Sequence, residues 1–183
     1  MEKLVRNDST PKYVPDYIAQ SLNDIDFEML KNRGVKYLAF DADSTLVRFR
    51  GRKLDAKNLK LLRSKRILFD KWCIASNRPI NDLQSLGKSI DAKVIRAILF
   101  NRKPSKRYFN KVISYFDAPP EQIAMIGDKL ISDIWGAKNV GFVTVWVSKL
   151  GTDNPWDKII GVRKVENYLM RKYYFNNQLT NEK

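Results

Sequence analysis

The chain has 183 residues, with 34 Lys and Arg against 20 Asp and Glu, a formal net charge of +14 and no histidine. The absence of imidazole excludes Ser-His-Asp and Cys-His nucleophile pairs and histidine-ligated zinc sites. A single cysteine, Cys73, also excludes disulfide frameworks and multi-cysteine metal sites. Any catalysis must therefore use carboxylates, lysine, hydroxyl groups or a metal ion bound by oxygen.

The composition is typical of one folded domain. The hydrophobic fraction is 44% and the charged fraction 30%, and no repeat or break in composition divides the chain. We therefore expect a single domain over residues 1–183. No apolar run approaches the roughly 18 residues of a membrane-spanning helix, and the first residues lack the apolar region of a signal peptide. These features predict a cytoplasmic protein, and the positive charge indicates an anionic partner.

In chain order, residues 1–33 form a polar lead-in, in which the apolar spacing over 16–30 predicts a short helix. Short apolar segments then alternate with helical periodicity. We expect strands at 35–40, 72–75, 94–100, 122–126 and 142–147, and helices at 55–64, 79–90, 104–116, 130–138 and 155–175. This alternation predicts an α/β fold, with a mostly parallel central sheet of about five strands flanked by helices.

Polar side chains suited to phosphate or metal binding follow four of the predicted strands. In parallel sheets, ligands bind beyond the carboxyl ends of the strands, so we expect these side chains to meet at one edge. Neighbouring carboxylates raise one another's pKa, and a hard divalent cation such as Mg²⁺ relieves that conflict. The residues are Asp41 and Asp43, Ser76 and Asn77, Lys103, and Asp128 and Asp133.

These residue types are suited to phosphoryl transfer. Asp41 can act as a nucleophile, while Asp43 can carry a proton to the leaving group and later activate water. Ser76, Asn77 and Lys103 are the expected phosphate-binding residues. Taken singly, each is more typical of a turn, a helix cap or a solvated side chain. Their order after successive strands favours a phosphate-handling site.

The segment 41–46, Asp-Ala-Asp-Ser-Thr-Leu, together with Ser76, Lys103 and the loop at 127–133, resembles the four motifs of the haloacid dehalogenase (HAD) superfamily of phosphohydrolases. The resemblance covers residues 35–147 and implies a Rossmann-like HAD fold. It also implies an aspartyl-phosphate on Asp41 and acid–base catalysis by Asp43.

The same resemblance implies a Mg²⁺ site. Its ligands would be Asp128, the Asp41 carboxylate and the backbone carbonyl of Asp43, and Asp133 would support these ligands. HAD enzymes insert cap domains on either side of the position that Ser76 occupies. Both intervals are too short here to hold a domain, so we expect a capless member with an open site.

A closer resemblance points to subfamily IIIA, which includes phosphatidylglycerophosphate phosphatases. It is carried by the lead-in at 15–34, the triplet Arg102-Lys103-Pro104, and the loop at 127–133. The resemblance implies hydrolysis of phosphatidylglycerophosphate to phosphatidylglycerol. Ala42, Ser44 and Arg78 depart from the subfamily pattern, in positions that bear on the substrate more than on the reaction.

Positive charge is concentrated in two stretches. Residues 48–71 hold ten Lys and Arg with two acids, and residues 93–111 hold seven with none. These stretches are compatible with peripheral contact with an anionic membrane, and a solvated basic face is an equally simple interpretation of residues 48–71. The apolar residues of the predicted helix at 155–175 could lie in a membrane interface, but packing against the sheet is the favoured interpretation of them. Two other functions stay open: a HAD phosphatase for a soluble, nucleic-acid or protein phosphate, and a non-enzymatic protein that binds nucleic acid or ribosomes. An oligomer in which a partner covers the site also stays open.

Overall fold

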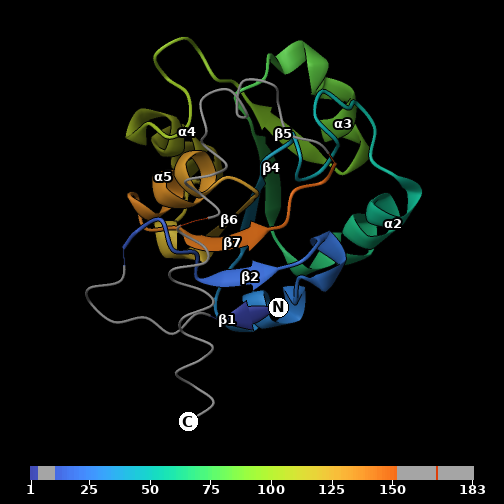
Figure 1. Cartoon of the computed structure of the whole chain (residues 1–183), viewed down its shortest axis with the longest axis horizontal. Helices are drawn as coiled ribbons and strands as arrows, with labels where there is room; N and C mark the ends of the chain where they lie inside the picture. Colours follow the sequence, from blue (N-terminus) through green and yellow to red (C-terminus); the bar gives the residue numbers. More distant parts are fainter. Residues whose placement is uncertain (4–10, 152–167, 169–183) are drawn as a thin grey trace.

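The structure, a computed structural model, describes residues 1–3, 11–151 and 168 (Figure 1). Its centre is a seven-stranded sheet in the order β1-β2-β7-β6-β3-β4-β5. Only β1 runs antiparallel to its neighbour, and the other strands are mutually parallel. The strands are β1 (Glu2–Lys3), β2 (Tyr17–Ala19), β3 (Tyr37–Phe40), β4 (Lys71–Ala75), β5 (Ala92–Ile95), β6 (Ile123–Gly127) and β7 (Val143–Val147). The predicted α/β fold with a mostly parallel sheet is confirmed.

Helices connect the parallel strands. The α-helices are α1 (Phe27–Asn32), α2 (Ala56–Lys65), α3 (Gln84–Ser89), α4 (Lys106–Phe116) and α5 (Gly136–Lys138). Short 3₁₀ segments are η1 (Leu22–Asp24), η2 (Arg66–Leu68), η3 (Ile80–Asp82) and η4 (Pro120–Gln122), and η5 (Leu130–Trp135) is a π-helix. Side-chain caps fix where the longer helices begin: Asp55 accepts from the Asn58 N–H, and Ser105 accepts from the Tyr108 N–H.

Both faces of the sheet are covered, which explains why its strands read as continuous apolar runs. Phe40, Trp72 and Ile126 lie in one core cluster, which also contains apolar residues of α1, α2 and α3. Ala39 and Met125, their chain neighbours, lie in a second cluster with residues of α4 and α5. Figure 1 shows α4 and α5 on the side of the sheet opposite α2 and α3.

The helix predicted at 16–30 is wrong. This segment contains the strand β2, the 3₁₀ turn η1 and the short helix α1. All three residues of β2 are buried, and β2 pairs in parallel with β7. Backbone pairing at the sheet edge therefore outweighs the helix-like apolar spacing. The two-residue strand β1, which pairs with β2, was not predicted.

The third predicted strand, at 94–100, ends early. β5 stops at Ile95, and residues 96–102 form a loop before α4. Its apolar residues Ile98, Leu99 and Phe100 are exposed, so they do not belong to a buried strand. The helix predicted at 130–138 is the π-helix η5 followed by α5. The helix predicted at 155–175 lies outside the described residues, apart from Tyr168.

The capless prediction is confirmed by the connections on either side of β4. Between β3 and β4 the chain forms only α2 and η2, and between β4 and β5 only η3 and α3. The carboxyl edge of the sheet therefore has no added domain in these connections. Among the described residues, no helix is both long enough and apolar enough to cross a membrane.

Candidate active site

The site lies where the strand order reverses. From β3 the chain runs to β4 and β5 on one side of β3, and from β5 it crosses to β6 on the other side. Such switch points open a crevice at the carboxyl ends of the strands. Asp41 directly follows β3, and its N–H donates to the Ile126 carbonyl of β6 over 2.9 Å. This bond continues the β3–β6 ladder and fixes the backbone of Asp41.

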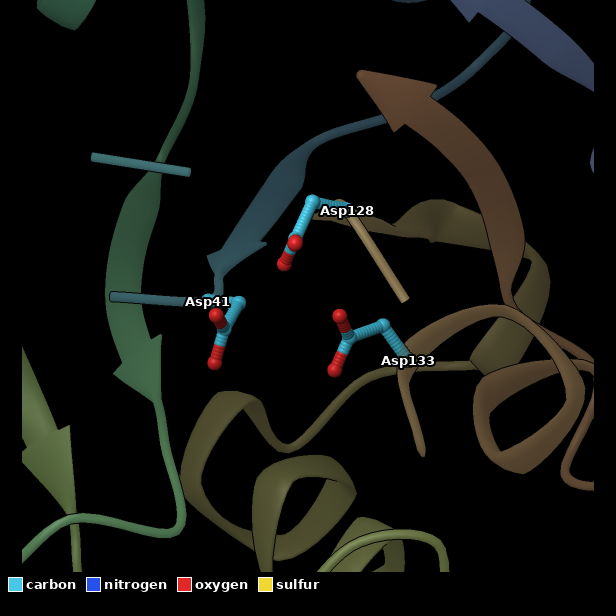
Figure 2. Close-up of side chains that lie close together, drawn as sticks. All are labelled: Asp41, Asp128 and Asp133. Atoms are coloured by element: carbon cyan, nitrogen blue, oxygen red, sulfur yellow. The ribbon is translucent and has the colours of Figure 1, made fainter. Parts of the chain in front are cut away.

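Three buried carboxylates meet at this edge. Oxygen atoms of Asp41, Asp128 and Asp133 lie within 4.8 Å of one another. Figure 2 shows the three carboxylates, from the segments after β3 and β6, turned toward a common space. Asp128 and Asp133 are fully buried, and Asp41 is 7% exposed. The predicted convergence of these acids is therefore present in the fold.

Lys103 joins two of these acids. Its Nζ lies 2.6 Å from Asp41 Oδ1 and 2.7 Å from Asp133 Oδ1, and the residue is itself buried. Burial acts to lower the pKa of Lys103, but Asp133 and Asp41 outweigh it, so the pKa is raised and the side chain stays an ammonium. Burial raises the pKa of Asp41 to about 7, and Lys103 acts to lower it.

The three acids form a candidate metal site. The close spacing of their oxygens and the all-oxygen donor set fit a hard divalent cation. Asp41, Asp128 and Asp133 are the side chains that would hold it. Two of these three acids are already oriented by other groups.

Asp133 is fixed by its own loop. Its Oδ2 accepts from the Lys129 N–H over 3.0 Å, and its Oδ1 accepts from the Ser132 hydroxyl over 3.0 Å. Gly127 packs directly against it, because a Cβ at Gly127 would lie 2.5 Å from Asp133 Oδ2. Only glycine allows this approach of backbone to carboxylate.

Asp128 is fixed by two residues that sequence reasoning missed. The Thr45 hydroxyl donates to Asp128 Oδ1 over 3.4 Å, and the Trp146 indole N–H donates to the Asp128 carbonyl over 2.8 Å. Thr45 lies in the segment of the first motif, which is the signal that could have identified it. Trp146 comes from β7, and nothing in its local sequence connects it to the site.

The Asp43 side chain is not part of the carboxylate cluster. Its Oδ1 accepts from the Arg50 N–H over 2.8 Å and pairs with Arg78 Nη1 at 3.0 Å. Arg78 Nη1 also donates to the Gly51 carbonyl over 2.8 Å, so it ties the loop after β4 to the loop after β3. Arg78 was not predicted as a site residue, although it directly follows Ser76 and Asn77. Proton transfer by Asp43 and metal binding by its carbonyl stay predictions.

Ser76 and Asn77 lie at the same edge with different contacts. Ser76 is buried, and its hydroxyl accepts from the Arg78 N–H over 3.3 Å. Asn77 uses both ends of its amide on the main chain of Lys103: Oδ1 accepts from the N–H over 2.8 Å, and Nδ2 donates to the carbonyl over 3.0 Å. Asn77 therefore positions Lys103, and its predicted contact with phosphate is not shown.

Above the buried acids is a cleft of about 610 Å³. Asp41, Asp43, Ser76 and Lys103 line it, so the predicted nucleophile, proton carrier and phosphate-binding residues face one space. Basic side chains outnumber the three acidic ones around it. These basic residues are Arg50, Arg52, Arg78, Arg102, Lys103 and Lys129. An anionic group in this cleft would meet positive charge at the entrance and the Asp41 carboxylate at the base.

Residues 100–158, which include Lys103, Asp128 and Asp133, match the model of the HAD-hydrolase-like family. Among solved structures, an uncharacterized protein from Listeria monocytogenes serotype 4b superposes with a TM-score of 0.52 at 17% identity, over 66% of this chain and 84% of that one. That similarity supports the fold alone.

Curated relatives of the chain carry phosphatase names. A glyceraldehyde 3-phosphate phosphatase from Pyrococcus furiosus is 51% identical over 45 residues, which are 25% of this chain and 19% of the relative. "Probable phosphatase YqeG" from Bacillus subtilis is 26% identical over 135 residues, 74% of this chain and 77% of the relative. The chain thus spans about a fifth of the Pyrococcus enzyme. These names support the predicted phosphatase class, and they say nothing about subfamily IIIA.

Proposed function

We propose that the chain is a Mg²⁺-dependent phosphomonoester hydrolase that works through an aspartyl-phosphate on Asp41. The observation that carries the proposal is the buried ion-pair chain from Asp41 through Lys103 to Asp133, with Asp128 beside it. A nucleophilic carboxylate, a fixed cation and an oxygen-rich metal site are the parts that phosphoryl transfer requires. The phosphatase names of two relatives agree with this chemistry.

In the first step, a carboxylate oxygen of Asp41 attacks phosphorus, and the bond from phosphorus to the ester oxygen breaks. Asp43 gives its proton to that leaving oxygen. In the second step, Asp43 takes a proton from water, the water oxygen attacks phosphorus, and the bond to Asp41 breaks. Inorganic phosphate leaves and Asp41 is restored. Lys103 and Ser76 hold the phosphoryl oxygens, and Mg²⁺ held by the buried acids would supply further positive charge.

Phosphatidylglycerophosphate is the substrate that we favour. Without a cap domain, the site can receive a phosphate that is presented on a large or aggregated substrate. The basic residues of the cleft, such as Arg52 and Arg102, suit a molecule with a second phosphate beyond the one that is hydrolysed. Subfamily resemblance and this charge support the lipid.

A second candidate is a small three-carbon phosphomonoester. The local identity of 51% to a glyceraldehyde 3-phosphate phosphatase favours it. An open cleft admits such a substrate as readily as a lipid headgroup. The substrate class therefore has to be measured directly.

The deciding experiment is phosphate release with Mg²⁺ from phosphatidylglycerophosphate in mixed micelles, beside glyceraldehyde 3-phosphate and a panel of other phosphomonoesters. Asp41→Asn is the blank. Asp70→Asn is the matched control, because Asp70 is exposed and lies just before the amino end of β4, whereas the site lies at the carboxyl ends of the strands. Preference for the lipid supports the proposal in full, and release only from small substrates replaces the lipid. No release from any compound, with nucleic-acid binding that is indifferent to Asp41→Asn, would favour the non-enzymatic alternative.

Asp43→Asn tests the proton-transfer role. The asparagine oxygen can still accept from the Arg50 N–H, so we expect the fold to persist. Loss of the proton carrier should lower the turnover rate by about 100-fold or more. Phosphate release and thermal unfolding should be followed on the same preparation. A variant that unfolds normally and retains full turnover would remove Asp43 from the mechanism.

A further inference from the structure

The loop between β5 and α4 exposes three consecutive apolar residues. Ile98 is 46% exposed, Leu99 81% and Phe100 94%. Two backbone hydrogen bonds order the turn. The Ile98 N–H donates to the Asn101 carbonyl over 3.1 Å, and the Asn101 N–H donates to the Ile98 carbonyl. In Figure 1 this loop projects from the body of the molecule, above α4. Exposed apolar clusters of this kind indicate a surface that contacts another protein, a ligand or a membrane.

The loop stands next to the active-site cleft. Two residues after Phe100 the chain reaches Arg102 and then Lys103, and both line the cleft. The apolar tip and the cleft entrance are therefore linked by a very short piece of chain. Whatever the tip binds is held close to the cleft entrance.

Positive charge surrounds the tip. Arg96 and Arg102 flank it and are exposed, and so are Lys106 and Arg107 at the start of α4. No acidic residue occurs anywhere in residues 93–111. An apolar tip with a basic surround has the pattern of a membrane-interface segment: apolar side chains enter the acyl region and basic side chains meet anionic headgroups. An apolar groove on a protein would explain the tip but not the one-sided charge around it.

We propose that the tip, Ile98–Phe100, inserts into the interface of an anionic lipid membrane, with Arg96 and Arg102 against the lipid phosphates. The inserted tip holds the entrance of the cleft at the lipid surface. The inference rests on the proposed function in one respect, since it gives that function a substrate presented in a membrane. It assigns membrane contact to a loop that the sequence analysis predicted to be part of a strand.

The test uses the full chain and co-sedimentation with vesicles of equimolar phosphatidylcholine and phosphatidylglycerol. The double variant Leu99→Ser/Phe100→Ser removes the most exposed part of the tip. Ile67→Ser is the matched control. Ile67 is 89% exposed, but it lies in η2, before the amino end of β4 and away from the carboxyl ends of the strands. We expect the double variant to lower vesicle partitioning at least about tenfold, since insertion of each of these side chains is worth about that much or more. The control should bind like the unaltered chain, and vesicles of phosphatidylcholine alone should bind less.

Unchanged vesicle binding by the double variant would overturn the inference, and so would failure of the unaltered chain to bind. A dimer that dissociates in the double variant while vesicle binding is retained would assign the tip to a second copy of the chain instead. Hydrolysis of the substrate panel of the deciding experiment, measured in parallel, separates the two proposals. Vesicle binding without hydrolysis contradicts only the proposed function, and hydrolysis without vesicle binding contradicts only the membrane contact.

Discussion

Lys103 is the residue on which the buried charges depend. Replacement by methionine would leave Asp41 and Asp133 buried without the cation that both of them contact. Removing one partner of a buried ion pair costs about 3–5 kcal/mol. We expect Lys103→Met to lower the free energy of unfolding by that amount, measured by urea titration in the presence of a metal chelator. Lys65→Met is the control: its pair with Glu28 at 3.4 Å is exposed, and such pairs contribute under about 1 kcal/mol. Equal losses in the two variants would contradict this assignment.

Among individual residues, the sequence predicted those whose position in the site follows from the topology of the sheet. Asp41, Lys103 and Asp133 come after strands, and parallel strands bring their carboxyl ends to one edge. It did not find Arg78, because its contact with Asp43 depends on how two loops fold over each other. The side-chain amide of Asn77 likewise turns to the Lys103 backbone, a direction that no spacing rule specifies.

Helix α4 ends on a residue with an unfavourable backbone conformation. Asp117 has a φ of +52° and donates its N–H to the Ile113 carbonyl, which is the left-handed cap that glycine favours. We expect Asp117→Gly to raise the free energy of unfolding by roughly 0.5–1 kcal/mol, because glycine adopts this φ without steric cost. Asp117→Ala should lower it, since alanine has the Cβ without the polar group that can bond locally. Urea unfolding of the two variants is the measurement, and identical stabilities would count against the cap.

The elements show where apolar patterning is informative. β3, β4, β6 and β7 were predicted because their runs of apolar residues fill both faces of a covered sheet. β2 was missed because three residues are too few to display a period of two, and only pairing with β7 makes them a strand. Residues 98–100 were assigned to a strand because they are apolar, but a pattern does not distinguish apolar residues of a core from those of an exposed tip.

Across the whole molecule, basic side chains line the cleft and acidic side chains are buried beneath it. The net charge of the chain is +14. The outer charge attracts anionic substrates and raises their encounter rate at low salt. Three carboxylates beneath the cleft would repel a phosphate, and the Mg²⁺ that we propose at this position would reduce that repulsion.

Because the carboxylates come from the segments after β3 and β6, an ion held between them links both halves of the sheet. A ligand that binds only the folded state stabilises it by about 2.7 kcal/mol at a hundredfold excess over its Kd. We therefore expect saturating Mg²⁺ to raise the melting temperature by about 5 °C or more, at roughly 2–4 °C per kcal/mol for a chain of this length. Asp128→Asn removes one ligand and should abolish most of this shift, whereas Asp70→Asn should keep it. Differential scanning calorimetry with and without Mg²⁺ measures all three proteins, and an equal shift in Asp128→Asn would show that the ion binds elsewhere.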